Sequence, residues 1–298
     1  MSYVISIGNF DGLHRGHLEL LKRMASLARD RDLRSVVISY DSHPAYTLNQ
    51  QARPLLLTPV DIKRQRILEL GIDQVELLHF DREFSLISAE DFLHGFLIPN
   101  YHPAVIVVGY DSHFGHQRRG DFTFLQSHAE RYGYELQYVE PVSYKDRPVS
   151  SSLIRELLLA GDLGEANQLL AQPYTLYGKV VPGSGLGMDL GFPTANLQLA
   201  DPHQLVPRKG IYLSRSKLGT ERIFGLTNIG SSPTVKHHGL TEIETHLLDF
   251  HDQIYGRDLQ VSLIQYLREE QLFADIKALQ LAVQQDLAYA RELIGKGV

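Results

Sequence analysis

GNFDGLHRGH, at residues 8–17, is the stretch that decides the fold of the first half of this 298-residue chain. A short apolar run precedes it at residues 3–7, and apolar residues with helical spacing follow it at residues 18–27. This order predicts a strand, a glycine-bearing turn and the start of a helix. Glycine lets the backbone approach a ligand closely, and the free N–H groups at a helix start bind phosphate well.

His14 and His17 lie three residues apart in this stretch. At a helix start, that spacing directs both rings the same way. An isolated pair of this kind is more often explained by two histidines in a solvated loop than by a ligand site. The order of strand, glycine turn, HRGH and helix favours the ligand site, in which two imidazoles and a set of backbone amides bind a polyphosphate.

Strands and helices alternate through the first half of the chain. Apolar runs of strand length follow the first one, and they lie at residues 35–40, 75–80, 104–108 and 135–139. A helix start is predicted between the second and third strands, with Thr58 as its cap and Pro59 in its first turn. This spacing indicates a doubly wound parallel sheet.

Polar residues follow the predicted strands where each one ends, as DSHP at 41–44 and GYDSHFG at 109–115. The carboxyl ends of parallel strands meet at one edge of a sheet, which is where such proteins usually bind ligands. Residues 150–155 open a further helix, and Arg155, one turn into it, suits a polyphosphate. Taken alone, residues 150–155 are explained equally well by an ordinary capped helix with a surface arginine. Likewise, the arginines at 118 and 119 fit a solvated loop at least as well as a contact with a substrate.

Composition narrows the classes of function. The length suits two domains, and 43% hydrophobic with 21% charged residues is typical of a soluble globular protein. A net charge of −6 gives no electrostatic footprint for nucleic acid. We expect no membrane span, because no apolar run approaches eighteen residues, and no signal peptide, because the N-terminus lacks a charged region followed by an apolar one. Zero cysteines exclude disulfides and thiolate metal sites, as in a cytoplasmic protein.

The pattern changes after a predicted helical connector at residues 160–172. Short strands and many glycines follow, and residues 273–293 have helical spacing. This pattern predicts a small β-barrel closed by one C-terminal helix. We therefore divide the chain into domains at residues 1–172 and 173–298.

Four stretches of the second domain stand out: PGSGLGMDLGFPTAN at 182–196, GIY at 210–212, TNIGSSPT at 227–234 and IETHLLDF at 243–250. A glycine-rich run is by itself a weak signal for phosphate binding, since flexible hairpins share it. Glu244 lies on an alternating strand, so the pattern alone allows either a solvent-facing carboxylate or one that faces a site.

GNFDGLHRGH, DSHP, VGYDSHFG at 108–115 and SSSLIR at 150–155 together resemble the adenylyltransferase module of bacterial bifunctional riboflavin kinase/FMN adenylyltransferases, which are also known as FAD synthetases. That module belongs to the HxGH nucleotidyltransferases, which have a Rossmann-like fold. The resemblance implies that His14, His17 and Arg155 are catalytic. It also implies nucleotide and flavin binding by Gly8, Asn9, Phe10, Asp11, Gly12, Asp41, His43, Gly109, Asp111, Phe114, Ser151 and Ser152. The chain departs from the family pattern at Ser42, Ser112 and His113.

The four stretches of the second domain are similar to the riboflavin kinase module, which is a six-stranded barrel. The resemblance implies that Thr194 and Asn196 hold Mg²⁺ and the nucleotide phosphates, and that Glu244 is the catalytic base facing the ribityl 5′-hydroxyl. It also implies ligand binding by Gly183, Gly185, Gly187, Pro193 and Asn228. Met188 stands where the family commonly has an arginine, so we expect weaker ATP binding or another cation in its place, such as Lys179 or Arg208.

The resemblance implies two reactions: riboflavin and ATP give FMN and ADP in the second domain, and FMN and ATP give FAD and pyrophosphate in the first. Phosphorylation needs a base for a neutral alcohol, whereas adenylylation needs in-line positioning and positive charge. The partners would be riboflavin, FMN and ATP, with neither nucleic acid nor membrane, and a homo-oligomer stays open.

Three alternatives also stay open. In the first, the protein is an FAD synthetase whose kinase domain is weak or inactive and serves as a flavin-binding regulatory module. In the second, it is a nucleotidyltransferase for another phosphorylated acceptor. In the third, it is a flavin- or RNA-sensing regulator on the same fold.

Overall fold

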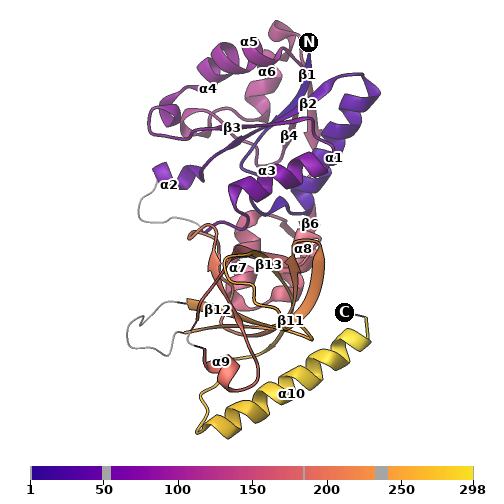
Figure 1. The fold of residues 1–298 in the computed structure, drawn as a ribbon. Helices are drawn as coiled ribbons and strands as arrows, with labels where there is room; N and C mark the ends of the chain where they lie inside the picture. The colour runs from indigo at the N-terminus through magenta and orange to yellow at the C-terminus, as the bar shows by residue number, and fades with distance from the viewer. Residues whose placement is uncertain (1, 49–54, 184, 232–240, 298) are drawn as a thin grey trace. The chain divides into compact units, whose positions relative to one another are not determined.

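The computed structural model describes residues 2–48, 55–183, 185–231 and 241–297, and Figure 1 traces their fold. These residues form two compact units, residues 1–151 and residues 152–298. The predicted combination of a parallel-sheet domain followed by an antiparallel barrel is confirmed.

The first unit is built on a parallel sheet with the strand order β3-β2-β1-β4-β5. Its strands are β1 (Tyr3–Ile7), β2 (Arg34–Tyr40), β3 (Gln74–Leu78), β4 (Pro103–Gly109) and β5 (Glu135–Val139). Each neighbouring pair is parallel. The central position of β1 makes its carboxyl end the place where the connections on either side diverge, which is where ligands bind in open α/β sheets.

Helices cover both faces of this sheet (Figure 1). On one face, α1 (Arg15–Asp30) and α3 (Val60–Glu69) bury Leu21, Met24 and Ile67 against the strands. On the other face, a wide helical turn, η3 (Phe92–Leu97), and α6 (Phe122–Tyr132) bury their apolar side chains. Each fully buried large apolar side chain stabilises the fold by about 1.5–3 kcal/mol.

Short elements complete the first unit. They are η1 (Asp11–Leu13), α2 (Pro44–Leu48), η2 (Phe84–Leu86), α4 (Ala89–Asp91), α5 (Ile98–Tyr101), η4 (His116–Arg118), β6 (Ser143–Tyr144) and β7 (Arg147–Pro148). The prediction that Thr58 caps the third helix is wrong. Pro59 is the N-cap residue of α3 and makes no side-chain cap, while the buried Thr58 gives its backbone N–H to the carboxylate of Asp11.

The second unit is a closed barrel with the strand order β10-β11-β12-β9-β8-β13. Its strands are β8 (Tyr174–Val181), β9 (Ala195–Leu199), β10 (Gly210–Leu218), β11 (Glu221–Ser231), β12 (Thr241–Leu247) and β13 (Asp258–Arg268). All neighbours are antiparallel. Closure gives every strand a hydrogen-bonded neighbour on each side.

Hydroxyl groups occupy part of the barrel interior. Thr227 Oγ1 donates to Ser214 Oγ at 2.8 Å and lies 2.9 Å from Thr245 Oγ1. All three side chains are fully buried. Because side chains alternate along a strand, the residues next to Thr227 and Thr245 face the outside of the barrel.

The helix α10 (Ile276–Gly295, yellow in Figure 1) packs on the outside of the barrel. Ala290, which is fully buried, contacts Leu213 and Leu226. Arg268 at the end of β13 makes two hydrogen bonds to Asp286 of α10, at 2.9 and 2.7 Å. A bidentate pair of this kind fixes the orientation of the helix as well as its position.

The helices α7 (Ser151–Ala160) and α8 (Leu163–Leu170) lie almost entirely within the second unit, together with the short α9 (Leu186–Asp189). Asn167 of α8 donates to the carbonyl of Leu263 at 2.9 Å and accepts from the N–H of Tyr174 at 2.7 Å. The compact units therefore divide earlier than residue 172, and a boundary of the functional domains at 172/173 stays a proposal.

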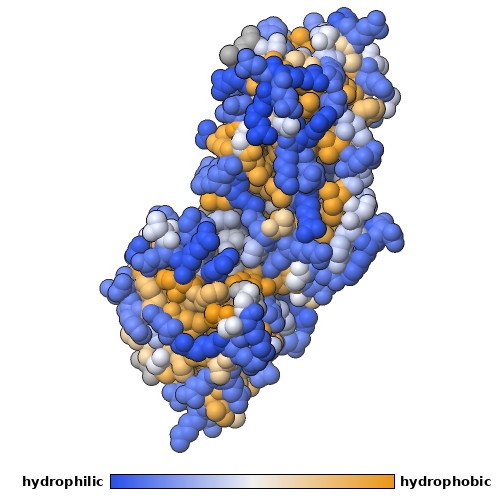
Figure 2. Space-filling view, turned by 90° about the vertical axis from the view of Figure 1, so that its right-hand side faces the viewer, coloured by the Kyte–Doolittle hydropathy of each residue, from blue (hydrophilic) through white to orange (hydrophobic). Residues whose placement is uncertain are grey.

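No helix within the described ranges is both long and apolar enough to span a membrane. On the face shown in Figure 2, hydrophobic residues are interspersed among hydrophilic ones.

Candidate active sites

The turn after β1 places two imidazoles face to face. The rings of His14 and His17 stack with their centroids 3.6 Å apart and an interplanar angle of 18°. His14 caps α1, because its Nδ1 accepts the backbone N–H of His17 at 3.4 Å. In its neutral form, a histidine that accepts at Nδ1 carries its proton on Nε2. The cap therefore leaves His14 with an N–H donor at Nε2.

The backbone of this turn is unusual. Gly12 has a φ of 81°, and Phe10 and Leu13, which are not glycines, have φ values of 52° and 48°. A non-glycine residue in this left-handed region costs on the order of 1 kcal/mol, and such residues cluster at functional sites. Both side chains are buried in the core, which holds the strained turn in place.

Asp11 and Ser151 fix the turn to other segments. The carboxylate of Asp11, which is 3% exposed, accepts the backbone N–H groups of Leu57 and Thr58, both at 3.0 Å. The hydroxyl of Ser151 donates to the carbonyl of Asp11 at 2.8 Å. Both residues were predicted to bind the ligand, and in this structure these groups position the loop.

His17 is electrostatically distinct from an ordinary histidine. Burial, with the nearby charges of His14 and Lys63, holds the pKa of His17 well below its usual value. Its Nδ1 is buried and has no hydrogen-bond partner among the described residues. The ring is therefore neutral near pH 7, so it offers a hydrogen bond to a ligand and not a positive charge.

Lys63 of α3 was not among the predicted residues, although its ammonium group lies under this turn. Its Nζ donates to the carbonyl of Asn9 and to Ser39 Oγ, both at 2.9 Å, and to the carbonyl of Tyr40 at 3.3 Å. Lys63 is 3% exposed, and burial lowers its pKa to about 8. No sequence pattern distinguished it from the other basic residues of the same helix.

The segment after β2 carries the next predicted residues. Asp41 lies 2.6 Å from His79 Nδ1 and accepts the N–H of Phe80 at 3.3 Å. Burial opposes ionisation of Asp41, but these hydrogen bonds outweigh it and lower its pKa. His43 Nδ1 accepts the N–H of Ala45 at 3.1 Å at the start of α2.

The segment after β4 divides between core and surface. The backbone N–H of Gly109 donates to Ser112 Oγ at 2.9 Å, and Asp111 is exposed. Phe114 is 6% exposed and packs on Phe92 and Phe124, so the structure places its ring in the core. Ligand binding by Gly109, Asp111 and Phe114 stays a prediction.

Ser152 and Arg155 lie on α7, in the second compact unit. Ser152 is exposed, and Arg155 is half-buried. Their action on a polyphosphate also stays a prediction.

The second site is a row of polar residues across three strands of the barrel. Glu244 of β12 is paired with Asn228 of β11 on one side and with Asn196 of β9 on the other. Since the hydroxyl-bearing residues Thr227 and Thr245 point inward, this row faces outward. The structure thus brings together predicted residues that are 48 positions apart in the sequence, from 196 to 244.

Glu244 is suited to take up a proton. Burial, with the neighbouring charge of Glu242, raises the pKa of its carboxyl group, although a hydrogen bond from Thr194 works in the opposite direction. A raised pKa brings a carboxylate closer to the range in which a general base is most effective near neutral pH. Beside it, Asn228 Oδ1 is buried without a hydrogen-bond partner among the described residues.

The glycine-rich loop passes close to this row. A Cβ atom built on Gly183 would lie 2.1 Å from Asn196 Nδ2, and one on Gly187 would lie 3.2 Å from Thr194 Oγ1. The carbonyl of Pro193 lies 2.9 Å from His246 Nδ1. Gly185, with a φ of 80°, is the third predicted loop glycine. Ser184 and residues 232–234, which belong to the quoted motifs, lie outside the described residues.

The two cations that could replace an arginine at position 188 differ in the contacts that they already make. Met188, where the family commonly has arginine, is 64% exposed. Arg208 pairs with Glu269, lies over the ring of Tyr266 and donates to a carbonyl of α7. Lys179 is exposed and lies 4.0 Å from Asp258. Of the two residues expected to replace that arginine, Lys179 therefore makes fewer contacts with other side chains than Arg208 does.

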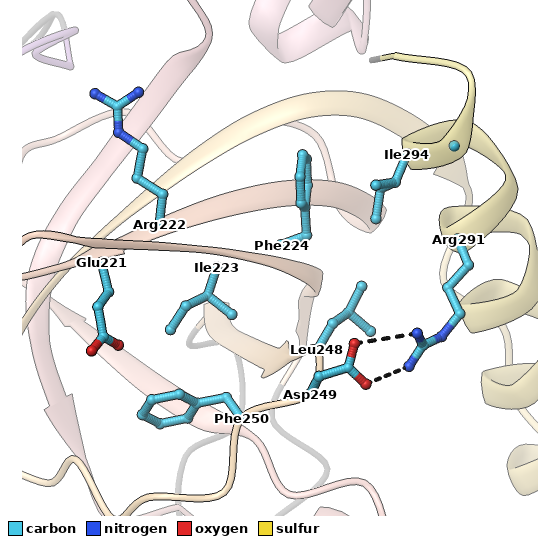
Figure 3. Close-up of a pocket in the computed structure, with 10 residues that line it drawn as sticks. Glu221, Arg222, Ile223, Phe224, Leu248, Asp249, Phe250, Arg291 and Ile294 are labelled. Carbon is cyan, nitrogen blue, oxygen red and sulfur yellow. Dashed lines mark hydrogen bonds and ion pairs between the residues drawn. The ribbon is translucent and has the colours of Figure 1, made fainter.

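A separate pocket lies between the start of β11 and the end of α10 (Figure 3). Ile223, Phe224 and Ile294 line it, and Asp249 and Arg291 form a two-bond ion pair across it, at 2.7 and 3.2 Å. None of the predicted site residues lines this pocket, so it is distinct from both candidate sites.

Comparisons with known proteins match both units. A family described as FAD synthetase matches residues 1–153, and one described as riboflavin kinase matches residues 170–294. The bifunctional riboflavin kinase/FMN adenylyltransferase of Escherichia coli K12 is 36% identical over 294 residues, which is 98% of this chain and 93% of the relative. The chain belongs to this family. The Pseudomonas fluorescens member is 37% identical over 97% of this chain and 92% of its own length.

A solved structure supports the fold. It is described as a macrolide-efflux protein from Streptococcus pneumoniae and is similar to this chain with a TM-score of 0.87 and 27% identity. The match covers 97% of this chain and 94% of the solved one. The two-domain architecture therefore recurs as a whole in an experimental structure.

The contact between Gly183 and Asn196 generates a prediction for the second site. In Gly183→Ala, the new methyl group would displace the Asn196 amide, because the two would lie 2.1 Å apart. We expect a loss of about 10²-fold in the rate of riboflavin phosphorylation with the fold retained, since a misplacement of about 1 Å can have that effect. The measurement is FMN formation from riboflavin and ATP, with thermal unfolding recorded for each variant.

Gly164→Ala is the matched control, because a Cβ atom there meets nothing within 4 Å and the residue lies on α8, away from the row. Equal rates for the two variants would contradict the placement of Asn196 in the site.

Proposed function

We propose that this protein makes FAD in two steps, phosphorylating riboflavin in its second unit and adenylylating FMN in its first. The single observation that carries the proposal is the outward-facing row of Asn228, Glu244 and Asn196, with Thr194 hydrogen-bonded to the carboxylate. A partly buried carboxylate among neutral oxygen and amide groups suits the activation of an alcohol. The family membership of both units supports the same assignment.

In the phosphorylation step, Glu244 accepts the proton of the ribityl 5′-hydroxyl as that oxygen attacks the γ-phosphorus of ATP. A general base contributes about 10²–10⁴-fold to such a step. The glycine-rich loop passes close to Asn196 and Thr194, where the phosphates would bind.

Mg²⁺ fits the second site on chemical grounds. Thr194 and Asn196 offer neutral oxygen atoms, which are ligands that Mg²⁺ accepts, and Asn228 Oδ1 is a buried acceptor without a partner among the described residues. Thr194 and Asn196 would hold the ion, which would neutralise charge on the transferred phosphoryl group.

The adenylylation step places other demands on the protein. The FMN phosphate is already an anion, so it attacks the α-phosphorus of ATP without a base, and pyrophosphate leaves. His14 and His17 donate hydrogen bonds to the phosphate oxygens, and the start of α1 adds backbone N–H groups. The alternative of an inactive kinase domain is not favoured, because both functional modules are matched.

The direct test is to incubate the protein with riboflavin, ATP and Mg²⁺ and to separate riboflavin, FMN and FAD by chromatography over time. FMN should appear first and FAD should follow. If the protein forms no FMN from riboflavin but converts supplied FMN to FAD, only the adenylyltransferase activity of the proposal is supported. No turnover of either flavin would overturn it.

His17→Ala should lower FAD formation from FMN by about 10²–10³-fold, because it removes a donor that stabilises charge in the transition state. FMN formation from riboflavin should be nearly unchanged. The two rates are measured separately, one starting from FMN and the other from riboflavin. Equal loss of both activities would contradict separate sites.

Glu244→Gln should lower FMN formation by about 10²–10⁴-fold while supplied FMN is still adenylylated. The pH dependence gives a second measurement. The carboxylate form is the active one, and its pKa is raised, so the wild-type kinase rate should fall with decreasing pH at a midpoint above the ordinary value for glutamate. The residual rate of the glutamine variant should not show this fall at low pH. If the variant shows the same fall, the titrating group is not Glu244.

A further inference from the structure

Lys63 is a charged residue that the proposed chemistry leaves unexplained. It lies on α3, a helix without any of the predicted site residues, and it is 3% exposed. Lysine is almost never fully buried unless its charge is matched by partners. Its partners here all lie at the carboxyl ends of β1 and β2, on the edge of the sheet that carries the HRGH turn.

The surroundings match an ammonium group and not a neutral amine. An ammonium has three N–H donors, and the structure supplies three acceptors: the carbonyls of Asn9 and Tyr40 and the hydroxyl of Ser39. Ser39 in turn donates to the carbonyl of Asn9 at 3.2 Å. A neutral amine has only two donors, so one acceptor would lose its bond.

We propose that Lys63 is a positioning residue for nucleotidyl transfer, which fixes the turn that carries His14 and His17 and places a positive charge beneath it. Its bonds hold the strand ends of β1 and β2 at a defined separation, and through Asn9 they hold the strained backbone on which the two imidazoles stack. This inference rests on the adenylylation proposed above for the first unit.

Other charged groups share this region. The carboxylates of Asp11 and Asp41 act on the ammonium, and the ammonium acts on the ring of His17. The pKa values of Asp41 and His17 are both lowered, so neither group changes its charge above pH 7, whereas Lys63 does. Burial lowers the pKa of Lys63 to about 8, which brings this change within reach of an activity assay.

The test compares the full-length wild type with Lys63→Met and Lys63→Arg. Methionine keeps the length of the side chain and removes its charge and donors. We expect kcat for FAD formation from FMN and ATP to fall about 10²-fold in Lys63→Met, with FMN formation from riboflavin unchanged. Lys22→Met is the matched control, because Lys22 lies on α1 of the same unit and is exposed.

The pH dependence shows whether Lys63 acts through its charge or only through its packing. The ratio of the wild-type rate to the Lys63→Met rate should decrease as the pH rises from about 7 to 9.5, because the wild type loses its ammonium. A ratio that stays constant over this range would overturn the proposal, as would wild-type activity in Lys63→Met. If Lys63→Met does not fold, the ratio of the wild-type rate to the Lys63→Arg rate is measured instead. This ratio should also decrease as the pH rises, because arginine keeps its charge while lysine loses it.

The outcomes also distinguish this inference from the proposed function. If the wild-type protein forms no FAD from FMN, the assignment of adenylylation fails. If the wild type forms FAD and Lys63→Met forms it at the same rate, the assignment stands and the role of Lys63 fails.

Discussion

Two opposite charges buried beneath one turn organise the first unit. Asp11 receives backbone N–H groups from the segment before α3, and Lys63 of α3 donates to the backbone of the turn and to the end of β2. A buried charge is tolerated only when it is hydrogen-bonded, so each side chain constrains the segments that supply its partners. The stacked imidazoles, the left-handed residues and the start of α1 all depend on this reciprocal arrangement between the turn and α3.

The second unit uses a different constraint, the register of a closed barrel. Alternation places Thr227 and Thr245 in the interior and their neighbours Asn228 and Glu244 outside. Inside, the hydroxyl of Thr227 hydrogen-bonds with those of Ser214 and Thr245, whereas the Oδ1 acceptor of Asn228 outside lacks a partner among the described residues. The same two strands thus supply a self-contained interior and a polar outer row that is available to a ligand.

Much of the fold could be predicted from sequence, because local patterns determine it. The apolar runs predicted all five strands of the parallel sheet, and the glycine-rich texture predicted the barrel. The outward direction of Glu244 could not be read from its own strand, since both faces fitted the alternation. It follows from the neighbouring Thr245, whose hydroxyl is buried against Thr227 in the barrel interior, a contact that only the folded chain brings about.

Long-range contacts explain what the sequence analysis missed. Lys63 meets Asn9 across 54 positions, and nothing near Lys63 in the chain indicates that partner. The predicted cap at Thr58 gave way to Asp11, a carboxylate 47 positions away. The lowered pKa of His17 has a similar origin, because the burial that causes it is a property of the assembled turn and not of the local sequence.

The pairing of β11 with β12 has a consequence for how this family can diverge. Insertion or deletion of one residue within β12 would exchange the two faces of that strand, so Thr245 would lie outside and a carboxylate would enter the hydroxyl-lined interior. Length changes along the lineage should therefore accumulate in the connections between strands and not within β12.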